Sequence, residues 1–139
     1  MMLVYFDSSA FVKLVVEEEG SDLAADLWDG CDAAVSSRLA YPEVRAALAA
    51  AGRAHRLAPA EQARAETGWE ELWMTVRTVE LTASVTAQAG ELASRYSLRG
   101  ADAVHLASVL ALGDTDTIFA AWDRQLRAGA QQARVRIAP

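Results

Sequence analysis

The fold is indicated most clearly by residues 3–12, which read Leu3-Val4-Tyr5-Phe6-Asp7-Ser8-Ser9-Ala10-Phe11-Val12. Residues 3–6 are a short apolar run rich in strand-forming side chains, and the run ends at Asp7. Ser8 or Ser9 can then cap a helix that carries Phe11 and Val12 on its buried side. A buried strand that leads directly into a helix is the repeating unit of α/β proteins.

The alternation of strand and helix continues along the rest of the chain. Further strands are predicted at residues 33–36, 76–81, 117–122 and 135–137. Helices are predicted to begin at Ser21 and Pro59, and to cover residues 37–55, 83–96, 101–112 and 124–132. This order predicts an α/β fold with a mainly parallel sheet covered on both faces. No repeat, low-complexity tract or linker divides residues 1–139, so we expect a single domain.

The composition narrows the class of protein. The formal net charge of −6 argues against a protein that grips nucleic acid through a broad basic surface. Cys31 is the only cysteine, so no disulfide can form within one chain, which suits a reducing compartment. The N-terminus lacks the basic segment of a signal peptide, and no apolar run is long enough to span a bilayer. We therefore expect a cytoplasmic protein.

Four acidic side chains fall at positions that suit a binding site. Asp7 and Asp123 each end a predicted strand, and ligands of open α/β sheets collect at the carboxyl ends of the strands. Asp102 lies in the first turn of a predicted helix, among small apolar neighbours, and Glu43 follows Pro42 near the start of another. Each position also has a simpler explanation. The two strand-ending aspartates can cap helices, and Asp102 and Glu43 can favour a helix dipole. Glu43 can also pair with Arg38 or Arg45 on the surface.

The combination of these four acids has a chemical consequence. Carboxylates that are brought together repel one another and raise each other's pKa unless a cation neutralises them. Magnesium suits such a site because it takes hard oxygen ligands and usually keeps several waters. A metal site of this kind can activate a water and stabilise the charge on a phosphodiester during hydrolysis.

The acids occur in four segments, in the order Val4-Tyr5-Phe6-Asp7-Ser8-Ser9-Ala10-Phe11-Val12-Lys13-Leu14, then Pro42-Glu43-Val44, then Arg99-Gly100-Ala101-Asp102-Ala103-Val104-His105-Leu106-Ala107, then Trp122-Asp123-Arg124-Gln125-Leu126. In this order the segments resemble the PIN-domain ribonucleases, and specifically the VapC-like toxins of toxin–antitoxin pairs. The similarity extends through nearly the whole chain. Any one of these motifs alone would be weak, but four in order are specific.

The resemblance implies a three-layer α/β/α sandwich around a parallel sheet of about five strands. It also implies an endoribonuclease that depends on Mg²⁺ or Mn²⁺ and leaves a 5′-phosphate and a 3′-hydroxyl. Asp7, Glu43, Asp102 and Asp123 would bind the metal directly or through water. Ser9 falls where the family places a hydroxyl that supports the site by hydrogen bonding.

The resemblance also implies partners. Toxins of this family usually form homodimers and are inhibited by a small VapB-like antitoxin, whose C-terminal segment covers the active site, often with an arginine. An acidic site is a suitable receptor for such a residue. One departure concerns Asp123, because many relatives carry Thr or Ser two residues earlier and this chain has Ala121. The hydroxyl that would steady Asp123 in those relatives is therefore absent from this chain.

Other side chains have a second interpretation beside a structural one. His105 lies three residues after Asp102 and could bind a metal, but a packed histidine among apolar neighbours is the favoured interpretation. Trp69 and Trp73 could stack on RNA bases, but their spacing favours the core or a dimer contact. Arg99, Arg124 and Arg127 flank the acidic motifs and could hold RNA phosphates.

The sequence argues against two other functions and leaves a third open. A phosphotransferase that uses Asp7 as nucleophile would need a second aspartate two residues later, where this chain has Ser9. A response-regulator receiver would need a lysine late in the chain, and the only lysine is Lys13. A catalytically inactive binding module with the same fold stays open, although the presence of all four acids counts against it.

Overall fold

The structure, a computed structural model, describes residues 1–113 and 116–139. Five strands form one parallel sheet in the order β3-β2-β1-β4-β5. The strands are β1 (Leu3–Phe6), β2 (Ala33–Ser37), β3 (Arg77–Val79), β4 (Ile118–Ala120) and β5 (Arg136–Ala138). The predicted parallel sheet of about five strands is therefore confirmed.

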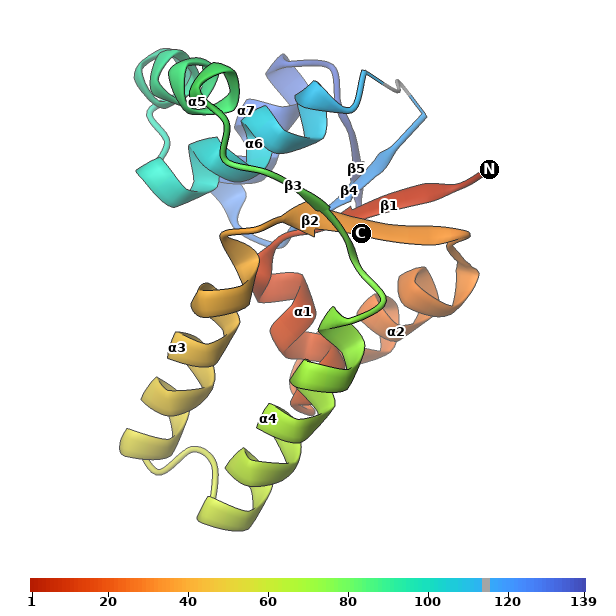
Figure 1. Ribbon diagram of the computed structural model, residues 1–139, viewed down its shortest axis with the longest axis vertical. Helices are drawn as coiled ribbons and strands as arrows, with labels where there is room; N and C mark the ends of the chain where they lie inside the picture. Colours follow the sequence, from red (N-terminus) through yellow and green to blue (C-terminus); the bar gives the residue numbers. More distant parts are fainter. Residues whose placement is uncertain (114–115) are drawn as a thin grey trace.

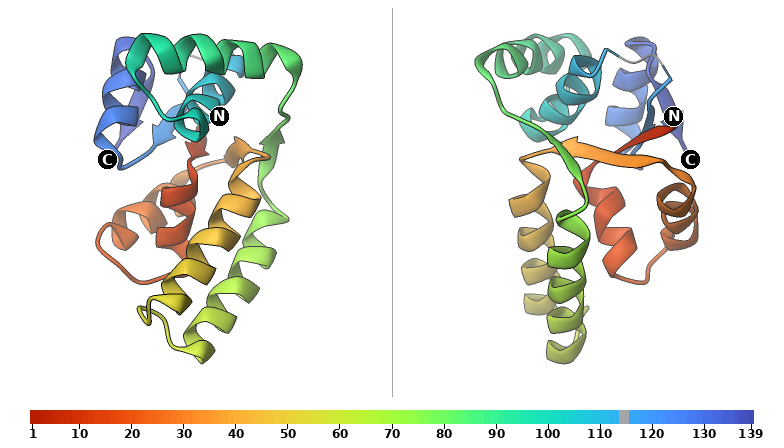
Figure 2. Two further views of the ribbon diagram at one scale, coloured as in Figure 1. Left: turned by 90° about the vertical axis from the view of Figure 1, so that its left-hand side faces the viewer. Right: turned by 45° about the vertical axis from the view of Figure 1, so that its right-hand side comes forward.

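Helices cover both faces of the sheet, which gives the predicted three-layer α/β/α arrangement (Figure 1). One face carries α1 (Ser8–Val15), α2 (Ser21–Gly30), α3 (Ala40–Arg53) and α4 (Pro59–Trp73). The other face carries α5 (Ala83–Tyr96), α6 (Gly100–Ala111) and α7 (Arg124–Gln132). The two further views in Figure 2 show that α3 and α4 pair as a long hairpin that extends away from the sheet. No helix in the described part of the chain has the length and apolar composition needed to cross a membrane.

Alternate side chains of β1 point to opposite layers, because successive residues of a strand face opposite sides of its sheet. Val4 and Phe6 pack into the core beside α1 to α4, whereas Tyr5 packs into the core beside α5 to α7. Trp69 is completely buried and contacts Phe11 across the first of these cores. The prediction that Trp69 belongs to the core rather than to an RNA surface is confirmed.

Several element boundaries differ from the sequence predictions by one or more residues, and three of the differences lie near the acids. β4 ends at Ala120, two residues earlier than predicted, so Ala121 and Trp122 belong to the connection into α7. Ser37 belongs to β2, and α3 begins only at Ala40, after the Leu39 N–H has bonded the Ser37 hydroxyl at 3.1 Å. Asp7, and not Ser8 or Ser9, caps α1.

The strand order creates a switch point between β1 and β4. From β1 the chain proceeds to β2 and β3 on one side, and it then crosses to β4 and β5 on the other side. Ligands of open α/β sheets bind at such a point, beyond the carboxyl ends of the strands. Asp7 follows β1, and Asp123 lies in the connection that follows β4.

Candidate active site

Asp7 lies at the end of β1 and is almost completely buried. Its Oδ1 accepts hydrogen bonds from the Ala10 N–H, at 2.9 Å, and from the Ser9 hydroxyl, at 2.8 Å. No hydrogen-bond donor within the described residues contacts its second oxygen, Oδ2. Burial raises the pKa of Asp7 above its ordinary value, and the negative charge of Asp102 raises it further, whereas His105 and the two hydrogen bonds lower it. A carboxylate in this position gains from a nearby cation.

Asp102 and Asp123 come from α6 and from the start of α7, and both face Arg99. The Arg99 Nε lies 2.9 Å from Asp102 Oδ2, and its Nη2 lies 4.0 Å from Asp123 Oδ1. Asp102 is in the first turn of α6, as predicted, whereas Asp123 caps α7 by accepting the Leu126 N–H on Oδ2 at 2.9 Å. The guanidinium thus marks a place where two carboxylates from different segments meet a positive charge.

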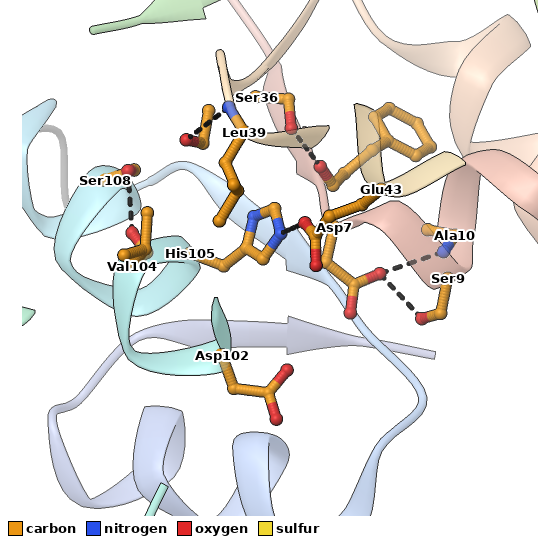
Figure 3. Close-up of polar contacts among 12 residues, drawn as sticks. Asp7, Ser9, Ala10, Ser36, Leu39, Glu43, Asp102, Val104, His105 and Ser108 are labelled. Carbon is orange, nitrogen blue, oxygen red and sulfur yellow. Dashed lines mark hydrogen bonds and ion pairs between the residues drawn. The ribbon is translucent and has the colours of Figure 1, made fainter. Parts of the chain in front are cut away.

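Glu43 bonds a histidine instead of a surface arginine. Its Oε1 lies 2.7 Å from His105 Nε2, while Arg38 pairs with Glu80 and Arg45 with Glu70. The suggested surface pair of Glu43 with Arg38 or Arg45 is therefore wrong. Glu43 belongs to α3 and His105 to α6, so this bond joins the helix layers of the two sheet faces at the edge where Asp7 lies (Figure 3).

His105 is buried, as the sequence predicted for a packed histidine. Its Nδ1 lies 2.8 Å from the Tyr5 hydroxyl and its Nε2 contacts Glu43, so both ring nitrogens are engaged by protein groups. The bond between Tyr5 and His105 was not predicted from the sequence. A buried tyrosine usually finds a partner for its hydroxyl. The only hint in the sequence was the position of Tyr5 on a buried strand, two residues before Asp7.

The four predicted acids share neighbours in the structure. His105 interacts electrostatically with Asp7 and contacts Glu43, and Arg99 interacts with Glu43, Asp102 and Asp123. Figure 3 shows Asp7, Glu43 and Asp102 arranged around His105, with Ser9 directed at Asp7. Ser9 and Glu43 also line one small surface hollow between α1 and α3. The segments that carry the acids therefore converge on one edge of the sheet.

The arrangement suits a hard cation that keeps much of its water. Within residues 1–113 and 116–139, no group of three or more His, Cys, Asp or Glu side chains is placed to hold one ion together. Mg²⁺ is commonly bound through one or two carboxylates, with water and substrate phosphate completing its coordination. A set of oxygen donors without a closed cage fits that habit better than it fits zinc, which needs a preformed tetrahedron.

The structure distinguishes the flanking arginines. Arg127 donates to the Ala121 carbonyl and to the Pro139 carbonyl, both at 2.8 Å, so it holds the connection between β4 and α7. These bonds and the capping bond fix the surroundings of Asp123 without the hydroxyl that Ala121 lacks. Arg99 and Arg124 are exposed near the acids.

The fold and the acidic edge of the sheet define a nuclease-like α/β domain, and comparison with known proteins identifies its class. The family model of the PIN domain matches residues 4–130, and the chain belongs to this family. The chain is also 63% identical to Ribonuclease VapC45 of Mycobacterium tuberculosis over 139 residues, which are 100% of this chain and 96% of that protein. It is therefore a member of the VapC ribonucleases within the PIN-domain family.

Solved structures with lower sequence identity share the fold. VapC20 of Mycobacterium tuberculosis, described as a sarcin–ricin loop cleaving toxin, is 21% identical with a TM-score of 0.67, over 90% of this chain and 93% of that chain. A chain of a toxin–antitoxin complex from Klebsiella pneumoniae is 15% identical with a TM-score of 0.66, over 98% of this chain and 96% of that chain. At these identities the comparison concerns the fold alone.

Proposed function

We propose that this chain is the toxin of a toxin–antitoxin pair and cleaves RNA phosphodiester bonds in a reaction that depends on Mg²⁺ or Mn²⁺. The observation that carries the proposal is the convergence of Asp7, Glu43, Asp102 and Asp123 at the switch point between β1 and β4. Its membership of the VapC ribonucleases supplies the reaction class. Both the RNA and the reaction would be cytoplasmic.

The four carboxylates would hold the metal, directly or through water. When bound, the ion supplies a water activated for attack and offsets the charge that develops on the phosphate. Ser9 keeps Asp7 Oδ1 engaged, so that Oδ2 stays directed away from the capping turn. Buried Asp7 would lose its unfavourable isolation on binding a cation, which favours an ion at this edge.

The exposed arginines Arg99 and Arg124 would bind phosphates of the RNA backbone beside the acids. Arginine suits this task because its planar guanidinium forms paired hydrogen bonds with phosphate oxygens. Since the net charge of the chain is −6, we expect weak RNA binding in the absence of metal. Tight RNA binding in chelator that hardly changes with salt would contradict this expectation.

Cleavage of purified RNA classes tests the proposal. Transfer RNA, ribosomal RNA fragments and messenger RNA are each incubated with the folded protein and Mg²⁺, Mn²⁺ or EDTA. We expect metal-dependent cutting of at least one class, with products that carry a 5′-phosphate and can be ligated without prior phosphorylation. If no class is cut by antitoxin-free protein under any metal condition, the inactive binding module becomes the better interpretation.

A small VapB-like antitoxin is the expected protein partner. The Arg99 pair shows that Asp102 accepts a guanidinium at this edge, and an arginine from a partner could bind the acids in the same way. Addition of the cognate antitoxin should abolish cleavage at an equimolar ratio. Substitution of the antitoxin's arginine by glutamine should relieve that inhibition, and full inhibition by the variant would contradict this mode of binding.

A homodimer is the expected assembly of the toxin itself. Met74 and Leu81 are two of the large apolar side chains that are exposed. Leu81 lines an apolar hollow together with Trp73, the residue before Met74. Exposed apolar patches of this kind often mark protein interfaces. Light scattering during gel filtration should report twice the chain mass, whereas a monomer at tens of micromolar would contradict the assembly.

A further inference from the structure

A continuous hydrogen-bond chain runs from the backbone of β2 to Glu43. The Ser37 N–H donates to the Tyr5 hydroxyl at 3.0 Å, the same hydroxyl lies 2.8 Å from His105 Nδ1, and His105 Nε2 lies 2.7 Å from Glu43 Oε1. Ser37, Tyr5 and His105 are buried, whereas Glu43 is only partly buried. The chain therefore begins in the rigid centre of the sheet and ends on a carboxylate at the candidate active site.

The direction of the chain follows from its donors. The backbone N–H of Ser37 can only donate, so the Tyr5 oxygen accepts this hydrogen bond. The hydrogen of the Tyr5 hydroxyl is then free to go to His105 Nδ1. The hydroxyls of Ser36 and Ser108 also lie beside the Tyr5 hydroxyl, but each gives its hydrogen to a backbone carbonyl, that of Phe6 at 2.6 Å and that of Val104 at 2.7 Å. His105 then carries its hydrogen on Nε2, where it faces Glu43.

We infer that His105 is a positioning residue, which fixes the Glu43 carboxylate for the metal, and that Tyr5 holds His105 in the tautomer required for this. The inference rests on the proposed function, because it takes Glu43 to be a metal-binding group. His105 is not itself a ligand, since both ring nitrogens are occupied. With Oε1 held by the imidazole, the carboxylate presents its other oxygen in a restricted set of orientations. Groups that hold a metal ligand in this way commonly change metal affinity by about 10- to 100-fold when they are removed.

A purely structural role would predict something different. A histidine that only fills the space between α6 and the sheet would affect folding stability when replaced, and any effect on metal binding would not depend on Glu43. A histidine that acts through Glu43 loses its effect once the Glu43 carboxylate has been removed. A double-mutant cycle between the two side chains separates these cases.

The cycle uses the full chain and Mn²⁺ alone as the probe, with free Mn²⁺ counted by electron paramagnetic resonance. The variants are His105→Phe, Glu43→Gln and the double variant, with His55→Phe as the matched control because His55 is exposed. His105→Phe should weaken Mn²⁺ binding by about 10- to 100-fold in the wild-type background and by less than about twofold in Glu43→Gln. His105→Gln, which keeps a side-chain N–H donor, should retain more affinity than His105→Phe.

The outcomes distinguish the inference from the proposed function. If Glu43→Gln weakens Mn²⁺ binding but His105→Phe does not, only the inference is overturned. An equal loss in both backgrounds also overturns it, since the effect would then bypass Glu43. If Glu43→Gln leaves Mn²⁺ affinity unchanged, the assignment of Glu43 as a metal-binding group fails, and the inference fails with it.

A spectroscopic measurement on the wild-type protein decides the case if a variant does not fold or binds Mn²⁺ too weakly to measure. Nitrogen chemical shifts of the histidine rings report which nitrogen carries the proton, and His55 serves as an exposed reference. We expect a ring hydrogen on Nε2 of His105, the nitrogen that faces Glu43. A hydrogen on Nδ1 with a bare Nε2 would contradict the inference, because Nε2 could not then donate to Glu43.

Discussion

Asp7 and Asp123 follow neighbouring parallel strands and use one carboxylate oxygen each to cap the next helix. Asp7 Oδ1 accepts the Ala10 N–H, and Asp123 Oδ2 accepts the Leu126 N–H, both at 2.9 Å. The Asp7 N–H in turn bonds the last carbonyl of β4, that of Ala120, at 3.3 Å. The capping and the functional interpretations of these aspartates are therefore compatible, because capping uses only one of the two oxygens.

Because the buried charge of Asp7 destabilises the fold, removing that charge should raise the stability of the protein and abolish its activity. Asp7→Asn removes the buried charge, while its amide oxygen can still cap α1 and accept from Ser9. We expect the variant to lose RNA cleavage and to melt at a higher temperature than the wild type in chelator. For a chain of this size, each kcal/mol added to the free energy of unfolding raises the melting temperature by about 3–5 °C. A lower melting temperature would contradict the claim that the ionised Asp7 carboxylate destabilises the folded protein.

The raised pKa of Asp7 also predicts how this difference changes with pH. Between the ordinary carboxyl pKa and the raised value in the folded state, the folded chain binds more protons than the unfolded chain. The contribution of Asp7 to the free energy of unfolding therefore falls as the pH rises through this window. Melting curves in EDTA from pH 4 to pH 8 should show a gap between Asp7→Asn and wild type that widens with pH. A gap that narrows would contradict the assignment.

Two substitutions at Asp123 separate capping from chemistry. Asp123→Asn keeps a good capping group, so the stability of the protein should change little. Asp123→Ala removes the cap as well and should cost about 1 kcal/mol, within a usual range of about 0.5–2 kcal/mol. Both variants should cleave RNA more slowly if the charge of Asp123 serves the metal. Full cleavage by Asp123→Asn in a metal titration would restrict Asp123 to capping.

Substitution of Arg99 should change metal binding and RNA binding in opposite directions. It pairs with Asp102 and lies near Asp123, so it competes with a cation for these carboxylates. Because the arginine is mostly exposed, Arg99→Gln should strengthen Mn²⁺ binding by less than about fivefold. The same variant should weaken RNA binding in the presence of metal. Arg95→Gln is a matched control on an exposed arginine of α5, and identical behaviour of the two variants would contradict the role of Arg99.

The fold could be predicted from the sequence because its signals are local. The apolar run that ends at Asp7 predicted β1, and the run that leads towards Asp123 predicted β4, which pairs with β1. The helix from Ala83 to Tyr96 was predicted with its observed bounds. The ends of β4 could not be predicted, because Ala121 and Trp122 are as apolar as the strand itself. Only their contacts, such as the Arg127 bond to the Ala121 carbonyl, place them in a connection.

The candidate site could be predicted only in part. The four acids were identified one by one, but the partner of Glu43 was not, because it lies 62 positions away on a helix of the opposite layer. Tyr5 bonds His105 across 100 positions, and no local pattern carries that information. Contacts of this kind depend on how α3 and α6 meet at the sheet edge, which follows from the packing of the whole domain.

The central claim, that four carboxylates form one metal-dependent ribonuclease site, is tested most directly by single-turnover cleavage of total cellular RNA. The rate constant is measured for wild type, Asp7→Asn, Glu43→Gln, Asp102→Asn and Asp123→Asn, with Glu91→Gln as a control on an exposed acid. We predict that EDTA abolishes cleavage, that each site variant is slower by about 100-fold or more, and that the control matches wild type. Cleavage that persists in EDTA, or at the wild-type rate in all four site variants, would contradict the claim.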